Sequence, residues 1–181
     1  FGDYPVTELA KKYDFIMMDH PHIGSAVEAS ALVPMDMYLS GEFLKDQEEN
    51  SVGRSYESYG MTGHQWALAA DAAAQISAYR EDLLEQAGDK IPNLHAECLN
   101  MNPIQTLDWM ADTNEIAYVP LLFGYSNYSR MDHAGKYLVK FTDIPSETDI
   151  PSGALLGGVG LAVSSGCKEL QTAMEFVQYA L

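Results

Sequence analysis

Aromatic and amide side chains lie at the end of an apolar run within residues 115–128 (EIAYVPLLFGYSNY). The stretch begins as a buried strand and breaks at Gly124. Around the break it offers Phe123, Tyr125, Asn127 and Tyr128. Aromatic faces stack on the CH faces of a sugar ring and an amide pairs with its hydroxyls, so these residue types suit a small neutral polyol. The competing interpretation is that the three rings are ordinary core or edge aromatics.

A second set of polar groups follows an earlier apolar run, residues 14–18 (DFIMM). Asp19, His20 and His22 come directly after it, and Asp71 lies within a run of small residues that would let another surface approach it closely. Two of these carboxylates, or one with Glu57, could serve hydrolysis, but their spacing does not favour that over ligand binding. The two histidines would need further metal ligands that no nearby spacing supplies, so a hydrogen bond from His20 to a ligand is preferred.

The elements that must position these groups alternate between helix and strand, which predicts βα units and an α/β fold. The continuous apolar run at 14–18 is typical of a strand in a parallel sheet. We expect helices at 6–13, with Thr7 as a possible N-cap, and from 25 to 31. Residues 64–68 are expected to form a strand that carries Trp66, another stacking face. Residues 75–79 alternate like a strand, although the neighbouring alanines make a helix the rival prediction.

The second half of the sequence predicts further elements. Helices are expected at 80–87, closed by Gly88, at 101–110 with Pro103 early, and at 168–181, with strands at 136–144 and 153–164. Gly157 and Gly158 lie in the last strand, where they permit positive φ or close backbone approach to a ligand. These glycines lie inside or before a strand rather than between strand and helix, which argues against a dinucleotide-binding loop.

Composition narrows the class of function. The 181 residues carry a formal net charge of −16, which argues against nucleic acid or an anionic membrane surface as a partner. Cys98 and Cys167 are too few for a zinc or disulfide framework, although one long-range disulfide stays open. The chain has no apolar run of membrane-spanning length and no signal segment, and it opens at Phe1 like a processed or cut fragment.

Four segments together resemble the extracellular solute-binding proteins of ABC importers, the group that includes maltose-binding protein. They are 13–24 (YDFIMMDHPHIG), 58–88 (SYGMTGHQWALAADAAAQISAYREDLLEQAG), 114–130 (NEIAYVPLLFGYSNYSR) and 153–181 (GALLGGVGLAVSSGCKELQTAMEFVQYAL). The resemblance implies a periplasmic-binding-protein-like, two-lobed α/β fold in which the chain crosses between lobes. Residues 1–70 and 157–181 would form the first lobe and 71–156 an incomplete second lobe. Segments of the family would be missing before Phe1 and between Pro92 and Asn93.

The resemblance also implies a function. The chain would be a monomeric, non-enzymatic receptor, extracellular or periplasmic, that needs no cofactor, binds a sugar or sugar derivative between its lobes and delivers it to a membrane permease. Lipid anchoring is left open. The expected ligand-binding residues are Asp19, His20, Trp66, Asp71, Phe123, Tyr125, Asn127, Tyr128, Gly157 and Gly158. Two alternatives remain: a receptor for a cationic solute such as a polyamine, with acids as counter-charges in an aromatic box, and a carboxylate-dependent glycoside hydrolase.

Overall fold

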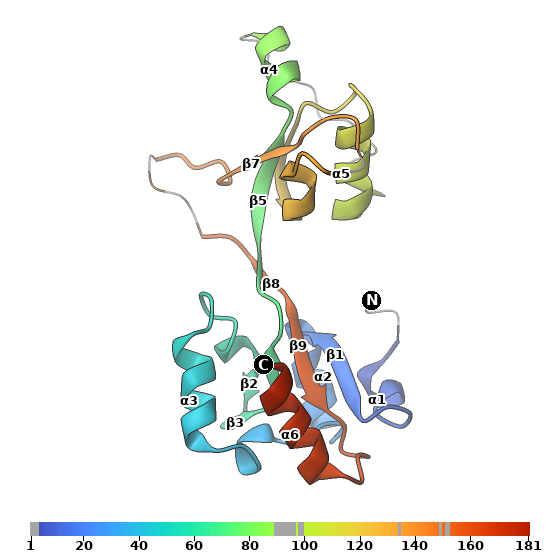
Figure 1. Ribbon diagram of the computed structural model, residues 1–181, viewed down its shortest axis with the longest axis vertical. Helices are drawn as coiled ribbons and strands as arrows, with labels where there is room; N and C mark the ends of the chain where they lie inside the picture. The colour runs from blue at the N-terminus through green and yellow to red at the C-terminus, as the bar shows by residue number, and fades with distance from the viewer. Residues whose placement is uncertain (1–3, 89–96, 98–99, 134, 149, 151–152) are drawn as a thin grey trace. The chain divides into compact units, whose positions relative to one another are not determined.

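The computed structural model describes residues 4–88, 97, 100–133, 135–148, 150 and 153–181. The chain divides into two compact units, each with its own sheet and helices (Figure 1). Unit 1 comprises Phe1–Ala72 and Leu156–Leu181, and unit 2 comprises Ala73–Leu155. The break expected between Pro92 and Asn93 lies outside the described residues, as does Cys98, whereas Cys167 is a buried free thiol.

The sheet of unit 1 has the strand order β1 (Phe15–Asp19), β9 (Val159–Val163), β4 (Ala67–Ala69). The expectation of a parallel sheet is wrong for these strands, because β9 runs antiparallel to both of its neighbours. Burial alternates along the apolar run of β1: Ile16 and Met18 are buried, whereas Met17 is 47% exposed. Ile16 and Met18 pack in a cluster with Ile23 and Ala26 of helix α2, while Phe15 lies on the other side with the last helix.

Helices flank this sheet, and two of them differ from their expected bounds. Helix α1 (Val6–Leu9) begins at residue 6 but ends well before residue 13, and its N-cap position is held by Pro5, without a side-chain capping bond, rather than by Thr7. Helix α2 (Ile23–Glu28) begins before residue 25, because the 3-10 turn η1 (His20–His22) leads directly into it. Helix α3 (Gly41–Glu49) follows the 3-10 turn η2 (Met35–Met37), and its first turn is capped by the Ser40 hydroxyl.

The last helix, α6 (Leu170–Ala180), buries the face that its sequence predicts. Ala173, Met174 and Val177 lie in the same cluster as Leu161 and Val163 of β9, and Leu170 packs at its edge. Spacing of three and four residues places these side chains on one side of the helix. The opposite face exposes Phe176 and Tyr179, although Phe176 also contacts the Phe15 ring at 4.9 Å between centroids.

The rest of unit 1 is the segment between α3 and the sheet. It contains the 3-10 turn η3 (Glu57–Tyr59) and a two-stranded hairpin, β2 (Gly60–Met61) with β3 (His64–Gln65). Thr62 and Gly63 at its tip both have positive φ, 52° and 82°, which is the backbone of a tight two-residue hairpin turn. The short strand β8 (Leu156–Gly157) precedes β9, separated from it by Gly158.

Strand β5 (Ala73–Tyr79) is the centre of the sheet of unit 2, with the order β6 (Tyr118–Phe123), β5, β7 (Lys140–Thr142) and antiparallel pairing. The strand interpretation of 75–79 is therefore confirmed over the helical one. Strand β6 begins later than residue 115 and is less buried than expected: Leu122 is buried, but Pro120 and Leu121 are exposed. Pro120 cannot donate to the ladder, and the register shifts opposite it, between Ile76 and Ala78.

The helices of unit 2 are α4 (Glu81–Ala87) and α5 (Pro103–Asp112), followed along the chain by the 3-10 turn η5 (Ser126–Ser129). Gly88 ends α4 with φ +60°, as its position predicts. Asn102 and Gln105 form a reciprocal capping box at the start of α5, with Pro103 at its first position. Leu107 and Met110 of α5 are fully buried and pack in a cluster with Ala78 and Leu122 of the sheet.

Arg80, at the end of β5, is completely buried in unit 2. Its guanidinium donates to both carboxylate oxygens of Asp82, at 2.8 and 2.7 Å, and to the carbonyls of Met110 and Thr113, each at 2.7 Å. The ring of Tyr137 covers it at 3.8 Å. A buried charge is tolerated only when paired and hydrogen-bonded, and Arg80 meets that condition through contacts that tie β5 to the end of α5.

Candidate functional site

Asp19 and Asp71 lie on either side of one residue of the central strand of unit 1. Asp19 pairs with Val159 of β9 from one side. From the other side, the backbone N–H of Asp71 donates to the Val159 carbonyl at 3.0 Å, and the Val159 N–H donates back at 3.2 Å. Each acid is thus one strand spacing from Val159, which puts their Cα atoms roughly 10 Å apart.

Both carboxylates are left with open hydrogen-bonding capacity. Asp19 is half-buried and Asp71 is exposed, and within the described part of the chain neither side chain receives a hydrogen bond or an ion pair. A carboxylate can accept up to four hydrogen bonds, so these two acids are available for hydroxyl or ammonium donors.

Tyr59 is buried near the same end of the sheet, and the sequence did not single it out. It is 1% exposed, and its hydroxyl makes a long hydrogen bond of 3.4 Å to the Met18 carbonyl. Burial, together with the negative charges of Asp19 and Asp71, raises the pKa of Tyr59 to about 12. The hydroxyl therefore stays neutral and both carboxylates lie near it.

His20 and Gly160 complete the surroundings of Tyr59. The His20 ring stands edge-on to the tyrosine ring, with 6.3 Å between centroids. A Cβ on Gly160 would lie 2.4 Å from the tyrosine ring, so only glycine lets the ring lie this close to β9. His20, one of the expected ligand-binding residues, therefore lies at the same end of the sheet as Asp19 and Asp71.

Trp66 lies in the same unit, directly after the hairpin. Its indole N–H donates to the Met61 carbonyl at 2.9 Å, and its ring, half-buried, packs at the edge of the cluster that contains Tyr59. The neighbouring His64 donates from Nδ1 to the Asp36 carboxylate at 2.9 Å, and this pair was also missed by sequence reasoning. Residues 28 positions apart gave no pattern by which the pair could be found.

Gly158 brings two backbone segments of unit 1 together. Its φ is +126°, and a Cβ there would lie 2.3 Å from the Asp71 carbonyl oxygen and 3.0 Å from the Ala72 Cα. The sequence suggested that a ligand could approach the backbone closely at Gly158, but the space beside Gly158 is filled by the backbone of Asp71. Gly157, in β8, is half-buried beside it.

The predicted aromatic group of unit 2 separates into exposed and buried members. Tyr125 is 43% exposed and Asn127 is exposed, whereas Phe123 is half-buried at the end of β6, opposite Gln75. Tyr128 is 4% exposed and packs in the core of unit 2. Its ring therefore has no open face for stacking, and of the three rings Tyr125 is the most accessible.

The hydroxyl of Tyr128 explains its inward position. It donates to Asp108 at 2.6 Å, and the ring lies 4.4 Å from that of His133. Burial, followed by the bond to Asp108, raises the pKa of Tyr128 to about 12. An apolar ring that buries well and a hydroxyl that finds a partner together favour the core over the surface.

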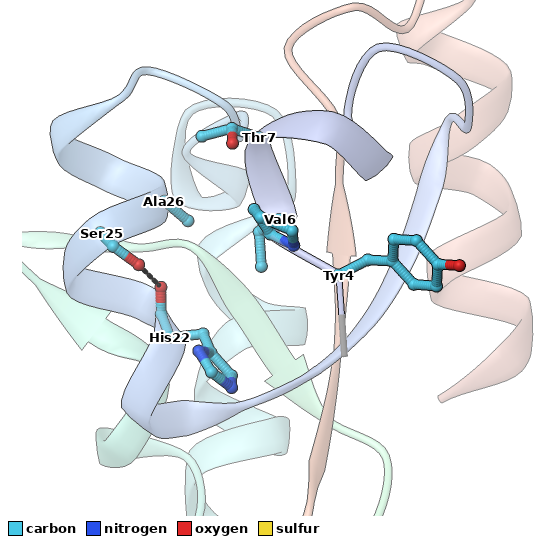
Figure 2. A pocket seen from close by; sticks show the side chains of 7 residues that line it. Tyr4, Val6, Thr7, His22, Ser25 and Ala26 are labelled. Atoms are coloured by element: carbon cyan, nitrogen blue, oxygen red, sulfur yellow. Dashed lines mark hydrogen bonds between the residues drawn. The ribbon is translucent and has the colours of Figure 1, made fainter. Parts of the chain in front are cut away.

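A separate pocket of about 340 Å³ lies between the start of the chain and α2 in unit 1 (Figure 2). It is lined by Tyr4, Pro5, Val6, Thr7, His22, Ser25 and Ala26. The Ser25 hydroxyl is already directed to the His22 carbonyl at 3.1 Å, and the lining has no carboxylate. None of the expected ligand-binding residues lines it. In the described part of the chain, no three His, Cys, Asp or Glu side chains are grouped to hold a metal.

The fold is that of the two-lobed periplasmic binding proteins, and the solved structures that it resembles include solute-binding proteins of ABC transporters. One is a solute-binding protein from Thermotoga lettingae bound with α-D-tagatose, with a TM-score of 0.70 and 14% identity over 97% of this chain and 64% of that chain. Maltose-bound MalE3 of T. maritima has a TM-score of 0.64 and 14% identity, again over 97% and 64%. UgpB of Mycobacterium tuberculosis, in complex with glycerophosphocholine, has a TM-score of 0.65 and 12% identity over 96% and 62%.

These comparisons define the fold and its extent. The chain spans about 64% of the length of the first of these proteins, which is consistent with an incomplete second lobe. No family model matches the sequence, and no curated protein matches it. Among the described helices, none has the length and apolar character needed to cross a membrane.

Proposed function

We propose that the chain is the substrate-binding component of an ABC transporter, which binds a small polar solute between two lobes and delivers it to a membrane permease. Residues 1–70 with 157–181 would form one lobe and 71–156 the other. The protein would act outside the cytoplasm, as a monomer and without a cofactor. The support is the fold shared with proteins whose crystal structures contain tagatose, maltose or glycerophosphocholine.

The observation that carries the proposal is the end of the unit 1 sheet, where Asp19 and Asp71 flank Val159 with their carboxylates unengaged. Charged acceptors of this kind pair well with the hydroxyls of a sugar, since hydrogen bonds to ionised groups are stronger than neutral ones. Trp66 in the same unit and the exposed Tyr125 of unit 2 would supply stacking faces. A sugar or sugar derivative is therefore the first ligand class to test.

A cationic solute such as a polyamine is the second candidate. It is favoured by one specific observation: two carboxylates lie near a single buried hydroxyl, and no described Lys or Arg pairs with either of them. An ammonium group would neutralise this local charge. Its affinity would fall steeply with added salt, whereas binding of a neutral sugar would change little.

A hydrolase using the same acids is the alternative from another class. Two of the structural neighbours are named as solute-binding or substrate-binding proteins, which argues against it. Turnover of a glycoside that disappears in Asp71→Asn would decide for the enzyme.

The experiment is a thermal-shift screen of the protein against sugars and polyamines at two salt concentrations. A ligand present at a hundred times its Kd stabilises the folded state by about 2.7 kcal/mol, which is a clear shift. Asp19→Asn and Asp71→Asn should reduce the shift for the same compound. Glu28→Gln is the matched control, because Glu28 is an exposed acid of unit 1 on α2. A ligand whose shift is unchanged in both Asn variants would contradict the assignment of this site.

A further inference from the structure

Asp36 ties the hairpin of unit 1 to the turn η2. One of its carboxylate oxygens accepts the backbone N–H of Gln65 at 3.0 Å, and the other lies 2.9 Å from Nδ1 of His64. Met35, the residue before Asp36, is fully buried in the core, so the carboxylate is presented from a fixed position. The His64 ring is therefore held at one nitrogen, with its side chain 41% exposed.

The same ring contacts Trp66. The two rings meet edge to face at 5.9 Å between centroids and 77°. Trp66 is held at two other points, by its indole bond to the Met61 carbonyl and by its backbone N–H, which donates to the Tyr59 carbonyl at 3.1 Å. The ring plane is thus set between the hairpin backbone on one side and His64 on the other.

We propose that His64 is a positioning residue for Trp66, held in place by Asp36, and that protonation of its ring is sensed by the indole. That Trp66 binds the solute rests on the proposed function, but the link from Asp36 through His64 to Trp66 does not. The indole ring carries an electrostatic quadrupole, so a charge that appears on the His64 ring, 5.9 Å away, acts on it, and the charge of His64 and the environment of Trp66 are coupled.

Among the residues that the structure describes, Asp36 is the charged group in contact with the His64 ring. Burial alone would raise the pKa of Asp36, but the hydrogen bonds from His64 and Gln65 hold it below its ordinary value, so Asp36 is a carboxylate throughout the neutral range. Tyr56 also faces Asp36: its pKa is raised by burial and then by the charges of Glu48 and Asp36. Since the pKa of Tyr56 is raised above its already high ordinary value and that of Asp36 is lowered, neither changes charge between about pH 5 and 8, and a change in that range belongs to a histidine.

The test uses the chain with Trp109→Phe, in which Trp66 is the only tryptophan, and needs no ligand. Its emission is expected to follow a sigmoid between about pH 5 and 8. His64→Gln should abolish the sigmoid, and Asp36→Asn, which keeps the histidine but weakens its hold, should reduce its amplitude. His22→Gln, which changes an exposed histidine of the same unit, should leave it intact.

Three outcomes would overturn the proposal: a flat profile in the parent protein, a sigmoid that survives His64→Gln, or an unchanged amplitude in Asp36→Asn. Far-UV circular dichroism confirms that each variant is folded, and Asp36→Asn provides a second reading should His64→Gln unfold. If the profile behaves as expected while no sugar or polyamine shifts the melting temperature, the positioning role stands and only the proposed function fails.

Discussion

Replacing Gly158 with alanine tests how the end of the unit 1 sheet is built. The residue has φ +126°, a region that side chains rarely adopt, and an added Cβ would lie 2.3 Å from the Asp71 carbonyl oxygen. That oxygen cannot move away cheaply, because it accepts the Val159 N–H at 3.2 Å. The substitution therefore combines backbone strain with a backbone clash at the point that positions Asp71.

The expected loss follows from these two terms. A residue forced into a sparsely populated backbone region costs about 1–3 kcal/mol. Crowding of a packed site costs about 1–3 kcal/mol more. Together they give a loss of about 2–6 kcal/mol in the free energy of unfolding of unit 1, which is a large part of the stability of an ordinary domain.

Two further glycines of unit 1 separate the terms. Gly63 has φ +82° with nothing within 4 Å of an added Cβ, so Gly63→Ala carries strain alone and should cost about 1–2 kcal/mol. Gly41 has neither strain nor a neighbour and begins α3, so Gly41→Ala should be neutral or slightly stabilising. Urea unfolding followed by Trp66 emission, in the Trp109→Phe chain, reports on unit 1. A Gly158→Ala midpoint no lower than that of Gly63→Ala would refute the clash.

Other predictions concern both units. Arg80→Met should lower the stability of unit 2 by about 1–3 kcal/mol, because the buried Met110 carbonyl loses its charged donor. Arg130→Met breaks an Arg–Asp pair that is 68% and 69% exposed and should cost about 0–1 kcal/mol. Urea unfolding followed by Trp109 emission, in a Trp66→Phe chain, measures both, because Trp109 lies in unit 2. The pKa of Tyr59 is raised to about 12, so the stability that its neutral hydroxyl contributes is complete below about pH 10 and lost as the pH rises to about 12; Tyr59→Phe should flatten that part of the stability profile. If the proposed function holds, Tyr125→Ala should weaken ligand binding about 5–150-fold by calorimetry, and an unchanged affinity in the folded variant would remove this ring from the site, while Phe123→Ala should have the smaller effect.

Local patterns in the sequence were enough for several elements of the fold. The helix that ends at Gly88, the alternating strand β5 and the buried face of α6 are all found where they were predicted. Each depends on residues close together in the chain: a glycine that adopts positive φ, a period of two, or a period of three to four. Such signals need no knowledge of what the element packs against.

Strand direction could not be found in this way. The apolar run of β1 suggested a strand covered on both faces, as in a parallel sheet. In the structure β1 is an edge strand whose burial alternates, with Ile16 and Met18 buried and Met17 47% exposed, so the run of apolar residues reveals neither the partner nor its direction. The partner, β9, lies more than 140 positions away. Side-chain direction was equally hidden at Tyr128, whose hydroxyl finds Asp108 twenty positions earlier in the chain.

The glycines show what a sequence signal can and cannot say about the candidate site. Close approach was inferred at Gly158, and it occurs, but the approaching group is the backbone at Asp71. At Gly124 an added Cβ would lie 2.2 Å from Ile76, and at Gly160 it would lie 2.4 Å from the Tyr59 ring. In each case the chain itself fills the space. Two of these contacts lie at the candidate site. The backbone at Asp71 packs against Gly158, and the Tyr59 ring packs against Gly160, on either side of Val159, the residue that pairs with Asp19. A missing side chain thus predicts that something comes close, and only the fold tells whether that is a ligand or another part of the chain.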